Sequence, residues 1–79
     1  MTTPDPTETL DVTGENCPMP VVKTKQAIEG LESGAVLEVL ATDAGSMSDL
    51  QGWAEATPGV ELLEQVEGDG RYTHYVRKA

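Results

Sequence analysis

Residues 14–20 read GENCPMP and hold the only cysteine of the chain, Cys17, immediately before Pro18. A cysteine thiolate is a strong nucleophile, and it is favoured at a helix N-terminus because the helix dipole stabilises negative charge there. Proline is preferred at the first helical position, so Pro18 predicts that a helix begins there and that Cys17 is its N-cap. The segment therefore predicts that Cys17 is a reactive thiol. The alternative is that Cys17 only packs in the interior as a small hydrophobic side chain.

The two prolines limit which backbone groups can reach the sulfur. Neither Pro18 nor Pro20 has an N–H. We expect the amide of Met19 to be the one free donor in the first helical turn and to point at the sulfur of Cys17. The Met19 side chain is expected to face outward, where an apolar group suits contact with a partner. Pro18, Met19 and Pro20 are thus predicted to shape the site of the catalytic Cys17.

Charged and polar residues flank the thiol on both sides. Glu15 and Asn16 precede it, and a carboxylate close to a thiol raises the pKa of that thiol. Lys23 and Lys25 follow on the predicted helix, where they could steer an acidic partner toward Cys17. Ordinary charge balance on an acidic surface is the alternative. We take these four residues as candidate partner contacts.

The single thiol excludes several kinds of site. One cysteine cannot build an intramolecular disulfide, a dithiol redox pair or a multi-cysteine zinc site, so we expect no metal and no cofactor. A single cysteine with no partner for a disulfide indicates a protein of the reducing cytoplasm. The first dozen residues lack the pattern of a secretory signal, and no stretch is apolar enough to span a bilayer.

The chain is strongly acidic, with 14 acidic and 5 basic residues and a formal charge of −9. Such a charge repels nucleic acid phosphates and anionic membranes, so direct binding to either is not expected. The acidity suits a solvated surface that keeps a monomer soluble, and it equally suits a high-salt cytoplasm.

Apolar periodicity predicts one small domain at residues 9–79 after a disordered tail at residues 1–8. Alternation predicts strands at 9–13, 36–42, 60–67 and 72–76, the last two joined by a turn at 68–70. Helical spacing predicts one helix from Pro18 to about Ser33, and a second from Ser46, capped by Ser46 and Asp49, to Thr57. The order β-α-β-α-β-β predicts an α/β (α+β) two-layer sandwich with the first two strands parallel.

Two other residues, His74 and Trp53, could have a functional role. His74, the sole histidine, lies in the last predicted strand, and we expect a strand residue with a hydrogen-bonded polar tip rather than a base for Cys17. Trp53 is expected to pack at the core or its edge rather than to dock a partner.

Several segments together resemble the TusA/SirA sulfur-carrier family. They are Leu10-Asp11, Gly14, Cys17-Pro18-Met19-Pro20 with Val21 and Val22, the strand from Gly34 to Ala41, Asp49-Leu50 with Trp53, and the stretch from Tyr72 to Lys78. The resemblance implies a four-stranded mixed sheet with two helices on one face. It also implies a sulfurtransferase that takes sulfane sulfur onto the cysteine as a persulfide. The donor would be a cysteine desulfurase or a rhodanese-like protein, and the downstream sulfur-acceptor protein would serve tRNA thiolation, molybdenum-cofactor synthesis or related sulfur metabolism.

Two other classes of function stay open from the residues alone. A small α/β module can be a non-catalytic regulator or associate with RNA, although the charge of −9 opposes RNA binding. A single-thiol redox sensor is the other, and without a resolving cysteine its disulfide would have to form between chains.

Overall fold

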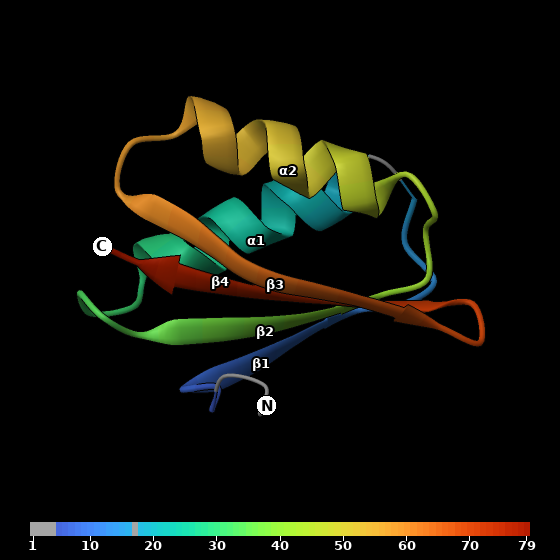
Figure 1. The fold of residues 1–79 in the computed structure, drawn as a ribbon, viewed down its shortest axis with the longest axis horizontal. Coiled ribbons are helices and arrows are strands. Elements are labelled where there is room, and N and C mark those ends of the chain that lie inside the picture. The colour runs from blue at the N-terminus through green and yellow to red at the C-terminus, as the bar shows by residue number, and fades with distance from the viewer. Residues whose placement is uncertain (1–4, 17) are drawn as a thin grey trace.

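The computed structural model describes residues 5–16 and 18–79 as a four-stranded sheet and two helices. In chain order the elements are β1 (Glu8–Val12), α1 (Met19–Glu29), β2 (Val36–Ala41), α2 (Ser46–Ala56), β3 (Val60–Gly68) and β4 (Arg71–Lys78). The strands lie in the order β1-β2-β4-β3, with β1 parallel to β2 and the other pairs antiparallel. Figure 1 shows α1 and α2 on the same side of this mixed sheet. The predicted two-layer sandwich is confirmed.

One hydrophobic core lies between the sheet and the helices. Side chains alternate across a strand, so every second residue of β1, β2 and β4 faces the helices. The buried members of this set are Val12, Leu37, Val39, Ala41 and Val76, and the helices add Ile28 and Leu50. Trp53 is partly buried and packs against the same cluster, as expected.

Helix α1 ends at Glu29, earlier than the predicted end near Ser33. Gly30 follows directly, and the ammonium of Lys78 on β4 closes the helix end. Its Nζ donates to the carbonyl oxygens of Glu29 over 3.2 Å and of Leu31 over 2.7 Å. A cation is favourable at this end because helix carbonyls there have no intrahelical partner. The helix thus ends just before Gly30, and a distant strand supplies the donor for the carbonyl groups at that end.

The predicted capping of α2 by Ser46 and Asp49 is wrong. Gly45 is the N-cap, Ser46 is the first helical residue, and no side chain caps the helix. The Ser46 side chain is fully buried, and its Oγ lies 3.0 Å from Nε2 of His74. A buried hydroxyl needs a hydrogen-bonding partner, and the imidazole provides one from within the core.

A hydrogen-bond network fixes His74 in its neutral form. Nε2 of Gln65 donates to Nδ1 of His74 over 3.0 Å, so the imidazole proton is on Nε2 and points to Ser46. The same Gln65 amide donates to the Met47 carbonyl, and its oxygen accepts from Gln51. Burial lowers the pKa of His74 from 6.5 to about 4. The expectation of a strand residue with a satisfied polar tip is confirmed, and the network ties α2 to β3 and β4.

The hairpin turn lies where the sequence predicts it. Gly68 pairs with Arg71, and the two residues between them, Asp69 and Gly70, both have positive φ, at 55° and 74°. Two positive φ values define a type I′ turn, whose twist matches that of the flanking strands. Farther along, the register of β3 shifts between Leu62 and Glu64, so this edge strand is irregular.

Candidate functional site

The candidate site is the loop from Thr13 to Pro18 between β1 and α1. Cys17 itself lies outside the described residues. The N-cap of α1 is Pro18, so the prediction that Cys17 is the helix N-cap is wrong. The residues on both sides of it are described, and they define the frame that holds this part of the chain.

The start of the loop is held by two local contacts. The Asp11 carboxylate accepts hydrogen bonds from the Thr13 amide over 2.9 Å and from the Thr13 hydroxyl over 2.7 Å. These bonds lower the pKa of Asp11, the hydroxyl contributing most, because they stabilise the charged form. The Glu15 amide then donates to the Val12 carbonyl over 3.2 Å. The chain therefore turns sharply as soon as it leaves β1.

A contact from a distant loop holds the middle of this turn. Gly14 has φ of 82°, a conformation that favours glycine, and its N–H donates to Oγ1 of Thr42 over 2.8 Å. Thr42 directly follows β2, and the carboxyl ends of parallel strands meet at one edge of a sheet. Sequence reasoning missed Thr42, although its position after a strand parallel to β1 was the available signal.

Helix α1 begins one residue later than predicted, at Met19, with Pro18 as the N-cap. The Met19 amide donates to the Asn16 carbonyl over 2.9 Å. The prediction of a free Met19 amide aimed at sulfur is wrong, because a carbonyl oxygen, a better acceptor than sulfur, already binds it.

Pro20 is at the second helical position rather than the third, and its side chain is fully buried. Backbone N–H groups in the first turn have no intrahelical partner, so a proline there costs no helix hydrogen bond. Pro20 anchors the first turn of α1 in the core, a role that sequence reasoning did not give it.

The Glu15 carboxylate forms an ion pair with the ammonium of Lys23 on the second turn of α1. Glu15 was expected to raise the pKa of the thiol. Lys23 offsets that negative charge, and the pair also links the loop before Cys17 to the helix after it. Both side chains are partly exposed, so this ion pair contributes at most about 1 kcal/mol to stability.

An apolar surface lies on the first turn of α1. Met19 is 39% exposed and Val22 37% exposed, and among the described residues only Val66 on β3 is another exposed large hydrophobic side chain. The predicted outward position of Met19 is confirmed. Asn16 and Pro18 are also exposed. The residues next to Cys17 in sequence therefore present apolar and neutral groups to solvent.

Lys25 does not join Lys23 at this site. Residues two apart on a helix point in different directions. Lys25 instead lines a hollow of about 320 Å³ that also contacts Trp53 and Lys78, toward the C-terminal end of α1. The structure therefore brings Glu15 and Lys23 together and separates Lys25 from them. His74, buried under α2, is not part of the site.

Comparison with known proteins gives the family. A family model for the sulfurtransferase TusA matches residues 8–78. The chain belongs to the TusA sulfur carrier family. A candidate sulfur carrier protein of Halobacterium salinarum is 69% identical over 74 residues, which cover 94% of this chain and 91% of that protein. The sulfur carrier protein TusA of Allochromatium vinosum is 40% identical over 89% of this chain and 91% of its own length.

A solved structure agrees with the fold of this TusA-family chain. The SirA-like protein of Desulfitobacterium hafniense superposes with a TM-score of 0.71 at 34% identity, covering 91% of this chain and 96% of the other. The resemblance inferred from the sequence is confirmed for both family and fold.

The described residues of this TusA-family chain show neither a candidate metal cluster nor a membrane-spanning helix. Residues 5–16 and 18–79 contain no group of three histidine, cysteine, aspartate or glutamate residues placed to hold a metal ion. In the same ranges no helix has the length and apolar character needed to cross a membrane.

Replacing Thr42 with valine is expected to loosen the loop that leads to Cys17. The Gly14 N–H loses its acceptor, so its amide should exchange with solvent several-fold faster, with a loss of about 0.5–1 kcal/mol in unfolding free energy. Hydrogen exchange by NMR and urea denaturation measure the two effects. Thr42→Ser keeps a hydroxyl and should restore protection of the Gly14 amide; equal protection in the valine variant and the wild type would contradict the role of Thr42.

Proposed function

We propose that this TusA-family protein carries sulfane sulfur as a persulfide on Cys17 and transfers it to a partner protein, as a sulfurtransferase. The main support is that the family match spans the segment containing Cys17, the only cysteine in the chain. With no second cysteine, the persulfide cannot be discharged within the chain as a disulfide and sulfide. A single thiol therefore suits a carrier that releases sulfur only to a partner.

The transfer is an exchange at sulfur that needs no added oxidant or reductant. The Cys17 thiolate attacks the outer sulfur of a donor persulfide, R–S–SH. A new S–S bond forms to Cys17 while the S–S bond of the donor breaks, and the donor leaves as the thiolate R–S⁻. The product is Cys17–S–SH. In the second step a nucleophile of the acceptor attacks the same outer sulfur, and Cys17 leaves as the thiolate.

The residues around Cys17 suit this exchange in distinct ways. Lys23 offsets the charge of Glu15, so the loop carries less negative charge that would oppose a thiolate. The exposed side chains of Met19 and Val22 offer apolar surface to a donor or acceptor that must bring its own sulfur to the thiol. Asn16, exposed and directly before Cys17, is proposed to contact the partner through hydrogen bonds.

The proposal includes partners and setting. The donor is a cysteine desulfurase or a rhodanese-like protein, and the acceptor feeds tRNA thiolation, molybdenum-cofactor synthesis or related sulfur metabolism. One thiol and no intramolecular disulfide suit a monomer in the reducing cytoplasm, built as one domain over residues 9–79.

Intact mass spectrometry after incubation with a cysteine desulfurase and cysteine tests the proposal. We expect the mass to rise by one sulfur atom, and dithiothreitol to remove the increase because it reduces a persulfide. A chain that gains no labile sulfur from either a desulfurase or a rhodanese-like donor would contradict the carrier function. A product at twice the chain mass that dithiothreitol splits would instead indicate a disulfide between two copies.

A further inference from the structure

Strand β1 lies at one end of the sheet, and among the described residues its outer edge pairs with no other strand. The Thr7 amide points inward and donates to the Val36 carbonyl over 2.7 Å. Backbone groups of successive strand residues point alternately to the two sides, so the N–H and C=O groups of Glu8 and Leu10 point to the open edge. Two residues of β1 thus offer a set of donors and acceptors to an added strand.

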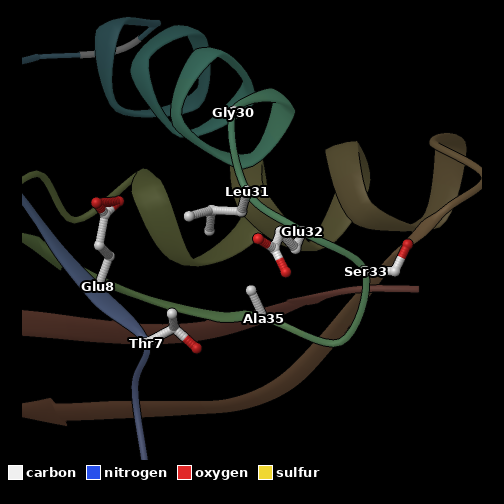
Figure 2. Close-up of a pocket in the computed structure, with 7 residues that line it drawn as sticks. All are labelled: Thr7, Glu8, Gly30, Leu31, Glu32, Ser33 and Ala35. Atoms are coloured by element: carbon white, nitrogen blue, oxygen red, sulfur yellow. The ribbon is translucent and has the colours of Figure 1, made fainter.

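A hollow of about 550 Å³ adjoins the start of this edge. Its lining residues are Thr7, Glu8, Gly30, Leu31, Glu32, Ser33 and Ala35. Figure 2 shows the Leu31 side chain extending toward Glu8, with Thr7 and Ala35 on the side of the strands. The carboxylates of Glu8 and Glu32 contribute two negative charges, and within residues 5–16 and 18–79 neither forms an ion pair or hydrogen bond. The hollow combines an apolar floor with two unpaired carboxylates.

The opposite edge of the sheet differs from β1. Strand β3 has an irregular register between Leu62 and Glu64, and such irregularities impede the addition of another strand. The register of β1 with β2 is regular over all five residues from Glu8 to Val12. Strand β1 also contains no proline or lysine, the residues that most often protect an edge. Its short length and the carboxylates of Glu8 and Asp11, which repel another acidic strand, are its evident protection.

We propose that the edge of β1 and the adjoining hollow bind an extended, basic segment of a partner protein as a fifth strand. In an added antiparallel strand, the residue opposite Glu8 has its side chain on the helix side, about 5 Å from that of Glu8. A lysine or arginine there reaches both Glu8 and Glu32 across the floor formed by Leu31. The residue opposite the half-buried Leu10 is apolar. The expected pattern is therefore an apolar residue followed, two positions later, by a basic one.

Charge favours a basic partner segment over a second copy of this chain. Two copies each carry a formal charge of −9, and β1 itself holds Glu8 and Asp11 and no basic residue. Pairing β1 with its own copy would bring these carboxylates together without cations to offset them, and like charges directly opposite are destabilising. A basic segment removes that repulsion. The proposal does not depend on sulfur transfer, because it uses no group of Cys17.

The test uses the full-length protein and two synthetic peptides. The first, Gly-Val-Thr-Val-Thr-Arg-Thr-Gly, matches the expected pattern, and the second has glutamate in place of arginine. With the arginine peptide we expect saturable amide shifts in NMR spectra on β1 and at residues 30–35, and at least tenfold slower exchange of the Glu8 and Leu10 amides. The glutamate peptide should give neither effect.

Variants that replace a carboxylate with a neutral amide show which carboxylates bind the arginine of the peptide. Glu8→Gln and Glu32→Gln should each weaken binding of the arginine peptide about two- to fivefold. Glu67→Gln removes an equal charge from an exposed position on β3 and should leave binding unchanged. Equal weakening by all three variants, shifts confined to other surfaces, or no saturable shifts would overturn the proposal. Slowed Glu8 and Leu10 exchange that rises with protein concentration, without peptide, would assign the edge to a second copy instead.

Discussion

Replacing Cys17 with alanine is expected to abolish sulfur loading completely while leaving the fold intact. Cys17 is the only thiol, so no other side chain of the chain can form a persulfide. The described residues on both sides of position 17 are held by their own contacts, including the bond from the Met19 amide to the Asn16 carbonyl. Intact mass measures loading by a desulfurase, and circular dichroism with urea denaturation measures the fold.

A matched variant separates loss of the thiol from disturbance of the loop. Asn16→Ala keeps the thiol and the backbone carbonyl that Met19 binds, so it should still reach full sulfur loading, although more slowly because the proposed partner contact of Asn16 is lost. If the Cys17→Ala protein acquires sulfur that dithiothreitol removes, sulfur is carried elsewhere and the proposed function is wrong. The β1 edge proposal would survive that result.

Lowering the pH from 7 toward 4 is expected to destabilise the protein through His74. Its pKa is about 4 in the folded state and 6.5 when unperturbed, so the unfolded chain binds the proton more readily. The stability contributed by neutral His74 is fully present above pH 6.5 and is lost as the pH falls from 6.5 to 4. A shift of this size corresponds to roughly 3 kcal/mol. Protonation at Nδ1 would also break the hydrogen bond from Gln65.

Urea denaturation between pH 7 and pH 4 measures this dependence, with His74→Gln as the control. Glutamine cannot titrate, so the variant should lack the fall in stability between pH 6.5 and 4, although it should be less stable at pH 7. Protonation of the surface carboxylates as a group acts in the opposite direction, because it reduces repulsion in a chain of formal charge −9. Asp11 is the exception, since hydrogen bonds from Thr13 lower its pKa and its protonation therefore destabilises the fold. Parallel curves for the two proteins would contradict the assignment to His74.

Local signals in the sequence determined the elements and the family. Alternating and helical periodicities predicted six elements in the observed order, since one buried face imposes each period. The run Gly68-Asp69-Gly70 predicted the hairpin turn, because glycine and aspartate readily adopt the positive φ values that Asp69 and Gly70 show. The end of α2 before Thr57 was also correct. The segment from Cys17 to Pro20 was recognisable because its residues are adjacent, so no knowledge of the fold was needed to identify the candidate nucleophile.

The partners of polar groups were predicted less well, even close to Cys17. The Met19 amide was expected to donate a hydrogen bond to the sulfur of Cys17, but it donates to the carbonyl of Asn16 instead. The error followed from placing the helix start one residue early, which changes the partner of every first-turn amide. Helix boundaries are weakly specified by residue type, because prolines are tolerated at several positions of the first turn.

Only the tertiary structure decided the contacts between distant segments. The Ser46 hydroxyl bonds to the His74 imidazole rather than capping the start of α2. The Gly14 amide bonds to the Thr42 hydroxyl, and the Lys78 ammonium bonds to the carbonyl of Leu31 just past the end of α1. Each of these groups has local alternatives of similar energy, and a single hydrogen bond contributes only about 1 kcal/mol. Burial of the apolar core is the larger energy, and it fixes how the strands and helices pack. The polar groups then form hydrogen bonds with whichever partners this packing places next to them.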